Sequence, residues 1–179
     1  MGPAVVIVTI LGLTGCGSAA SSTPNSTRGI TVPPRPAGPH PSVSSKMVCA
    51  AEVQGELQSG LGAQPTQVTA PTWIDHVYSC QYVYPNGTIT LSVKELDSAA
   101  QTARYFKDLG QRLGRRPDRI AIGQGAFVTT NGSMVVRKDW KVLDVDVSQL
   151  PASFGQPPQS ASDVAVSVAA TILTCWSGA

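Results

Sequence analysis

The chain has 179 residues and a formal net charge of +2, with 42% hydrophobic and only 13% charged side chains. Two of its 13 basic residues, Arg28 and Arg35, precede residues 46–179, which therefore carry 11 basic and 11 acidic side chains. A segment with this balance argues against a general nucleic-acid binder, which would need a strongly basic surface.

The N-terminal region has the pattern of a bacterial lipoprotein signal. An apolar run over residues 4–13 leads into Leu13-Thr14-Gly15-Cys16, which matches a lipobox. As a helix this run would reach about 15 Å, half of the roughly 30 Å hydrocarbon core, so we expect no stable transmembrane span. We predict cleavage of residues 1–15 and lipidation of Cys16. Residues 1–3 lack the usual basic side chain, and a cleaved signal without a lipid is the alternative.

The predicted cleavage site is followed by a tether. Residues 16–45 are rich in Ser, Thr, Gly and Pro, with too few apolar side chains to offset the entropy of ordering. Several prolines between residues 33 and 41 favour extended conformations. We therefore expect a disordered tether that holds a single domain, residues 46–179, at the outer face of the cell membrane.

Hydrophobic periodicity and turn residues predict the elements of this domain. Ser44 or Ser45 can cap the first helix and Gly62 suits its end, while Pro85-Asn86-Gly87 and Asn131-Gly132 are hairpin turns. In chain order we expect a first helix, a loop over 63–72, strands over 77–84 and 88–96, a helix over 98–113, a short strand over 120–123, strands over 126–130, 133–138 and 141–147, a Pro-rich link over 150–158, and a terminal helix.

Each predicted helix has an apolar face. In the first helix this face carries Cys49, Val53, Leu57 and Leu61, and in the second it carries Ala99, Ala103, Phe106, Leu109 and Leu113. In the terminal helix it carries Val164, Val168, Ile172, Leu173 and Trp176.

Alternation along two strands indicates which side chains are buried. Ile89, Leu91 and Val93 share one face of their strand, and the opposite face is polar. In the last strand Asp144 and Asp146 alternate with apolar residues, so we expect them on a solvated outer face. The order of elements predicts an α+β fold in which an antiparallel sheet of about five to six strands carries three helices.

A set of short motifs supports a family resemblance. The set comprises a Cys in the first helix, a second in Tyr78-Ser79-Cys80-Gln81-Tyr82, the turn Gly123-Gln124-Gly125-Ala126, the strand Met134-Val135-Val136-Arg137-Lys138, and an Ala/Val-rich terminal helix. Together these resemble actinobacterial, especially mycobacterial, cell-envelope lipoproteins of unknown function. They are also similar to LpqN-type lipoproteins and to the extracellular sensor domain of a mycobacterial receptor kinase. The resemblance implies a PsbP-like α/β/α sandwich with a binding or sensing role, and it supplies no catalytic residues.

The cysteines lead to a disulfide prediction. With Cys16 assigned to a lipid, three cysteines remain in an oxidising compartment, and any two of them can pair. A helix packed on a sheet brings Cys49 toward Cys80, and the resemblance also favours a link from the first helix to the first hairpin. We predict a Cys49–Cys80 disulfide and a buried free thiol at Cys175. The rival pairing, Cys49 with Cys175, would join the two terminal helices.

Catalytic signatures are lacking in the sequence. His40 lies in the tether and His76 stands alone before the first strand, where a solvated loop residue is expected. HExxH, CxxC and GxSxG are missing, and Gly123-Gln124-Gly125 lacks the third glycine of a dinucleotide-binding loop. Asp144 and Asp146 could form an acid pair or a Ca²⁺ corner, but a solvated face is the preferred interpretation. We predict no enzyme, no metal site and no cofactor.

One cluster of charge stands out in the neutral domain. Six basic residues stand against only Asp108 and Asp118, a net charge of +4. Such a cluster can bind an anionic component of the cell envelope, although a solvated helix face with an Arg-rich loop is the preferred interpretation. The candidate binding residues are Arg104, Lys107, Arg112, Arg115, Arg116 and Arg119.

Two functions follow from these patterns. The first is a membrane-anchored module that binds or senses an envelope protein, a glycan or an anionic lipid. The alternative is a carrier that holds a lipid or another apolar ligand in a cavity between sheet and helices.

Overall fold

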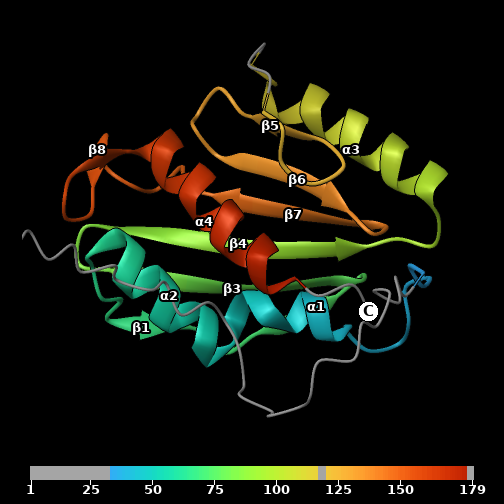
Figure 1. Cartoon of the computed structure of the whole chain (residues 1–179), viewed down its shortest axis with the longest axis horizontal. Coiled ribbons are helices and arrows are strands. Elements are labelled where there is room, and N and C mark those ends of the chain that lie inside the picture. The colour runs from blue at the N-terminus through green and yellow to red at the C-terminus, as the bar shows by residue number, and fades with distance from the viewer. Residues whose placement is uncertain (1–32, 117–119, 177–179) are drawn as a thin grey trace, which may run out of the picture.

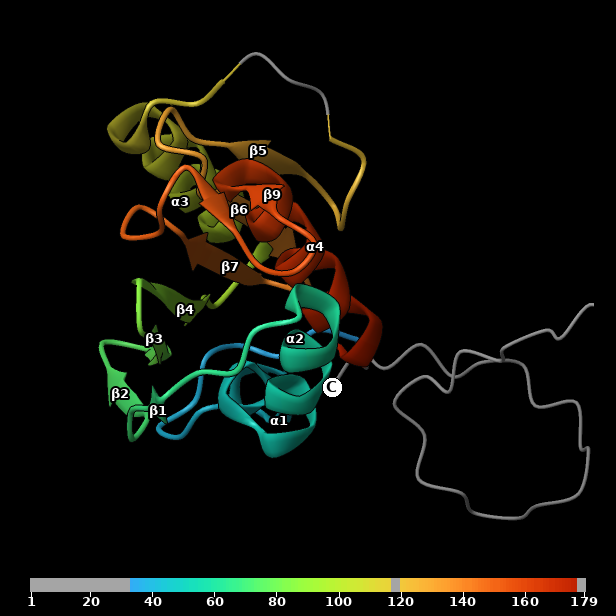
Figure 2. The same ribbon diagram turned by 90° about the vertical axis from the view of Figure 1, so that its left-hand side faces the viewer.

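The computed structural model describes residues 33–116 and 120–176, so the predicted signal peptide and Cys16 lie outside the described residues. Within that part of the chain, no helix combines the length and the apolar character that a membrane span requires. The described chain forms three layers, with helices on both faces of an antiparallel sheet (Figures 1 and 2). This arrangement confirms the predicted α+β class.

The main sheet has seven strands in the order β1-β3-β4-β7-β6-β5, and β2 also pairs with β3. The sequence predicted five to six strands. It missed β1, which lies within the stretch expected to be a loop, and the three-residue β2 that follows it. Residues 120–123, predicted as a strand, form bends and a turn instead. The strands are β1 (Gln67–Val68), β2 (Thr72–Ile74), β3 (Val77–Tyr84), β4 (Gly87–Glu95), β5 (Ala126–Val128), β6 (Met134–Lys138) and β7 (Lys141–Asp146), with a separate hairpin of β8 (Ser153–Phe154) and β9 (Gln159–Ser160).

The described residues contain four α-helices rather than the three expected. Side chains of Ser98 and Ser160 cap the N-termini of the second and third of the long helices. The helices are α1 (Val43–Lys46), the 3₁₀ helix η1 (Met47–Cys49), α2 (Ala51–Leu61), α3 (Ala99–Leu113) and α4 (Ala161–Cys175).

The fold begins before the predicted end of the tether at residue 45. Ser42, rather than Ser44 or Ser45, caps α1, and both of those serines are buried. A carboxylate oxygen of Glu95 on β4 accepts hydrogen bonds from the Ser42 N–H (2.8 Å) and the Ser45 hydroxyl (2.5 Å). The last residues of the predicted tether are therefore part of the domain.

The first predicted helix is broken at Ala50, whose ψ of 151° is extended. The Val48 carbonyl accepts a 2.7 Å hydrogen bond from the Tyr82 hydroxyl on β3, and Cys49 is bonded to the same strand. These two links hold η1 against the sheet and separate it from α2. Gly62 ends α2 as predicted, with φ +57°, and a Cβ there would lie 2.1 Å from the Gln156 carbonyl oxygen.

Cys49 and Cys80 form a disulfide, with sulfurs 2.19 Å apart and Cα atoms 6.0 Å apart, as the sequence predicted. The free thiol predicted at Cys175 was wrong: Cys175 is disulfide-bonded, and none of the described cysteines is free.

The two faces of the sheet carry separate apolar clusters. The larger cluster packs α2 and α4 on β3, β4, β6 and β7, and it includes the predicted inner residues Ile89, Leu91 and Val93. On the opposite face α3 lies over β5, β6 and β7 (Figure 2) and buries Phe106 and Leu109. Ala99 of the predicted α3 stripe is exposed, whereas Thr102 is buried.

Candidate anion-binding pocket

A surface pocket of about 350 Å³ lies where α3 meets the β5 end of the sheet. A second pocket, of about 410 Å³, shares Phe106 and Arg115 with the first and also includes Lys107. The first pocket is lined by Phe106, Arg115, Ile120, Ala121, Gly125, Ala126 and Arg137.

Arg115 enters this pocket because α3 ends sharply at Gly114, which has φ +71°. The Arg115 N–H donates to the Gly110 carbonyl (2.9 Å), and the residue then forms a β-bridge with Thr129 along the outer edge of β5. Its guanidinium carbon lies 5.5 Å from the centre of the Phe127 ring. The helix end, the bridge and the ring together fix the direction of the Arg115 side chain.

Arg137 reaches the same pocket from β6. Its guanidinium carbon lies 5.5 Å from the centre of the Phe106 ring, and its Nε donates to the Gln124 carbonyl (3.0 Å). The Phe106 and Phe127 rings pack edge to face with centres 5.0 Å apart. A pair of aromatic rings thus supports the two guanidinium groups.

Neither guanidinium group has a carboxylate partner among the described residues: Arg115 contacts an aromatic ring, and Arg137 a ring and a carbonyl oxygen. Arginine offers five N–H donors in a planar fork, and Arg137 has used only its Nε on a side-chain hydrogen bond. The pocket therefore presents donors and positive charge suited to an anion.

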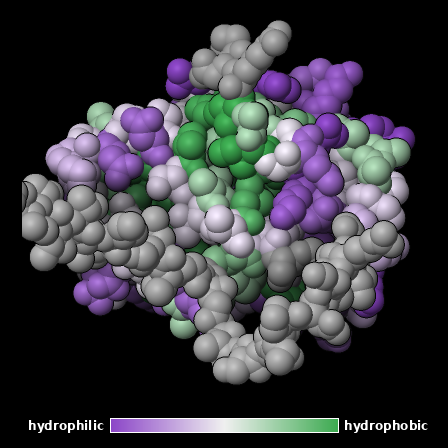
Figure 3. Space-filling model, viewed as in Figure 1, coloured by the Kyte–Doolittle hydropathy of each residue, from purple (hydrophilic) through white to green (hydrophobic). Residues whose placement is uncertain are grey.

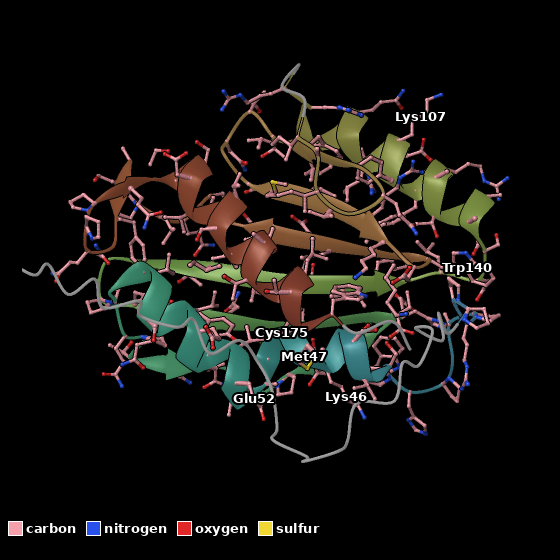
Figure 4. The ribbon with its side chains drawn as sticks, viewed as in Figure 1. Lys46, Met47, Glu52, Lys107, Trp140 and Cys175 are labelled. Atoms are coloured by element: carbon pink, nitrogen blue, oxygen red, sulfur yellow. A yellow bond between two sulfur atoms is a disulfide. The ribbon has the colours of Figure 1, made fainter. Side chains whose placement is uncertain are left out.

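The six basic residues that the sequence grouped as one cluster do not form a single site in the structure. Arg115 lines both pockets, and Lys107 borders the second one, projecting from α3 (Figure 4). Arg104 and Arg112 are exposed on α3 but line neither pocket, and Arg112 hydrogen-bonds to the Tyr105 side chain. Arg116 is exposed and takes part in a further interaction, while Arg119 lies outside the described residues.

Arg137 is the functional residue that the sequence did not identify. It follows the apolar run Met134-Val135-Val136, so it resembled the solvated end of a strand. Only the position of α3 and Phe106 over this strand reveals its place in the pocket. Alternation of side chains along the strand could have placed it on the same face as Val135, which packs under α3.

Asp144 is not on a solvated face, contrary to prediction. One of its carboxylate oxygens is buried without a hydrogen-bond partner, because α3 packs against β7. Burial, and to a smaller extent the charge of Asp146, raises the pKa of Asp144 to about 7. Asp146 instead accepts hydrogen bonds from the Ser133 hydroxyl (3.0 Å) and the Ser148 N–H (2.8 Å).

The structure offers these aspartates no further metal-binding partner. Within residues 33–116 and 120–176, no group of three or more His, Cys, Asp or Glu side chains could hold a metal ion. His76 is exposed in the turn between β2 and β3, as expected of a loop residue.

Another pocket, of about 690 Å³, lies between α2 and residues 64–71. Its lining is uncharged and contains several glutamines, among them Gln54, Gln58 and Gln64. The Gln54 amide already donates to the Cys49 carbonyl (3.1 Å). The smaller Arg115–Arg137 pocket has the more distinctive chemistry.

Comparisons with known proteins found no match to any family model, curated protein or solved structure. The resemblance to mycobacterial envelope lipoproteins and the PsbP-like architecture stay predictions that rest on the sequence motifs alone.

Proposed function

We propose that this chain is a membrane-anchored extracytoplasmic lipoprotein whose domain binds an anionic partner of the cell envelope. The lipobox at Cys16 supports the anchor, and the Arg115–Arg137 pocket supports the binding role. The proposal includes no catalysis, since neither the sequence nor the pocket supplies a nucleophile paired with a base.

The observation that carries the binding role is the pair of guanidinium groups in one pocket. Arg115 packs on the ring of Phe127, and Arg137 packs on the ring of Phe106. Each is held in a defined direction, so less conformational entropy is lost when it binds an anion. This pre-organisation distinguishes the pocket from a solvated charged face.

The alternative role of apolar carrier has less support. A carrier needs a cavity of several hundred Å³ between sheet and helices. On the α2 and α4 side, that space is filled by side chains that are fully buried, such as Val53, Ile89, Val168 and Ile172. The binding module is therefore the function proposed.

Exchange of both pocket arginines is expected to weaken binding to acidic vesicles. The Arg115→Gln/Arg137→Gln variant should lose about tenfold or more in affinity for phosphatidylglycerol vesicles, because a hydrogen bond to a charged group contributes about 1.5–3 kcal/mol. Raising the salt concentration should also weaken the binding of the parent protein to these vesicles. Co-sedimentation of the full chain with vesicles measures both effects.

Arg104→Gln is the matched control, since Arg104 carries the same charge on an exposed part of α3 outside the pocket. It should change the affinity by less than about twofold. An equal loss in both variants would show that diffuse charge, and not the pocket, causes binding.

The anchor gives a separate prediction. Cys16→Ala removes the thiol that would carry the lipid, so the protein should move from the membrane fraction to the soluble or secreted fraction. Fractionation and immunoblotting of a bacterial host that processes lipoproteins measures the shift. Retention of the variant in the membrane fraction would refute lipidation at Cys16.

A further inference from the structure

We propose that the ligand of the Arg115–Arg137 pocket is a phosphate monoester of an apolar alcohol. This inference rests on the proposed function and narrows it to one chemical class. Its basis is that one small pocket combines two guanidinium groups with an apolar wall.

Charge and hydrogen-bond geometry favour phosphate over carboxylate. A carboxylate has two oxygens, and one arginine fork can engage both of them. A phosphate monoester has three terminal oxygens and close to two negative charges near neutral pH, so it can engage Arg115 and Arg137 at the same time. Its two negative charges also match the two guanidinium groups.

The rest of the pocket calls for an apolar group beside the phosphate. Phe106, Ile120, Ala121 and Ala126 line it together with the arginines. A bare phosphate would occupy the guanidinium side and leave this wall in contact with water. An ester with an alkyl or prenyl group would cover the wall as well.

Ile120 links the pocket lining to the main core. It lines the pocket and, like Ile122, packs partly buried against the main core cluster. Val166 and Leu173 of α4 are also partly buried against that cluster. Figure 3 shows apolar surface gathered over the β5–β6 end of the sheet and the adjoining length of α4.

Gly125 shows how closely the backbone approaches Arg137. Gly125 has φ +153°, and a Cβ at this position would lie 2.9 Å from Arg137 Nε. The Gly125 carbonyl also accepts from the Arg137 N–H (2.9 Å). A side chain here would push the guanidinium group away from its ring, so Gly125→Ala tests the pocket without changing its charge.

The test is calorimetric titration of the full chain with three soluble probes. These are monomeric dihexanoyl phosphatidic acid, inorganic phosphate and dihexanoyl phosphatidylcholine. We expect the phosphatidic acid to bind at least about tenfold more tightly than inorganic phosphate, because it also buries apolar surface. Phosphatidylcholine should bind weakly or not at all, since its choline group cancels the charge.

Variants separate the two parts of the pocket. Arg115→Gln, Arg137→Gln and Gly125→Ala should each weaken phosphatidic acid binding by about tenfold. Ile120→Asn should weaken it while leaving the affinity for inorganic phosphate unchanged, because Ile120 would contact only the apolar group. Arg104→Gln is the control and should leave both affinities within about twofold.

The outcomes also distinguish this inference from the proposed function. Equal affinity for inorganic phosphate and phosphatidic acid would overturn the apolar-ester inference, but it would leave an anion-binding module in place. Failure to bind any anionic probe, in solution or in vesicles, would overturn both. Vesicles doped with phosphatidic acid identify the source: binding to vesicles and monomers supports a membrane lipid, and binding to monomers alone supports a free ester.

Circular dichroism of each variant checks that it is folded. If an arginine exchange disturbs the fold, Ile120→Asn still decides the inference, since Ile120 is half-buried at the rim of the pocket. An unchanged preference for phosphatidic acid in folded Ile120→Asn would contradict an apolar contact at this wall.

Discussion

Replacement of Cys49 and Cys80 together by alanine is expected to lower the free energy of unfolding by about 3–4 kcal/mol. The disulfide closes a loop with a sequence separation of 31, and in the chain-entropy model its loss increases the entropy of the unfolded chain by that amount. Alanine is the appropriate substitute at Cys80, which is only 2% exposed, because serine would bury an unpaired hydroxyl. Denaturant unfolding under non-reducing conditions measures the change.

Chemical reduction is the parallel measurement: it should lower the free energy of unfolding of the Cys49→Ala/Cys80→Ala variant much less than that of the parent, because the variant lacks this bond. A loss below about 1 kcal/mol in the Cys49→Ala/Cys80→Ala variant would contradict the expected contribution of this loop.

Asp144→Asn is expected to stabilise the protein at pH 8 and to have little effect at pH 4. In the unfolded chain the carboxyl titrates near its ordinary pKa of 3.8, whereas burial raises its pKa to about 7 in the fold. Folding therefore takes up a proton between these values, and stability falls as the pH rises from about 4 to about 7. The difference between the folded and unfolded pKa values lowers the free energy of unfolding by up to about 4 kcal/mol above pH 7. The neutral amide of the variant avoids this loss.

Denaturant unfolding at both pH values tests this expectation. Asp108→Asn is the matched control, because it makes the same exchange at an exposed position on α3 and should change the free energy of unfolding by less than about 0.5 kcal/mol. A variant at Asp144 that is no more stable than the parent at pH 8 would contradict the burial of a costly charge. The Asp146 charge, which also raises the pKa of Asp144, is left intact in both variants.

The elements that the sequence predicted well are those whose signals are local. The first hairpin has alternating side chains and a Pro-Asn-Gly turn, and β3 and β4 occupy almost the expected residues. The Ser98 cap and the exit at Gly114 bound α3 in the same way. The Cys49–Cys80 bond was predictable because a helix packed on a sheet brings these two elements together.

The features that the sequence missed depend on contacts between distant segments. The break at Ala50 has no local cause such as Pro or Gly; it follows from the hydrogen bond between Tyr82 and Val48 and from the disulfide. Strand β1 exists because β3 offers it an edge, although its surroundings look like a loop.

The candidate site shows the same limit. The sequence identified Arg115 as part of a basic segment, but it could not show that Arg137 on β6 lies in the same pocket. Alternation correctly put Asp144 opposite the main core, yet it could not show that α3 would cover that side. Charge and periodicity therefore indicated the basic segment that contains Arg115. The packing of α3 on the sheet determined which other residues join it in the pocket and that Asp144 is buried.

The bond between Cys49 and Cys80 also sets a mechanical limit on the domain. If the chain is anchored through Cys16 as proposed, tension on the tether first loads the hydrogen bond from Trp73 Nε1 to the Pro39 carbonyl (3.0 Å) and then those from Ser42 and Ser45 to Glu95. Once these break, α1 and η1 can unravel only to Cys49, which is joined covalently to β3. Residues 42–48 would lengthen the tether by at most roughly 25 Å. Beyond that point, the force passes into the sheet through the sulfur–sulfur bond, and α2 is spared from unwinding.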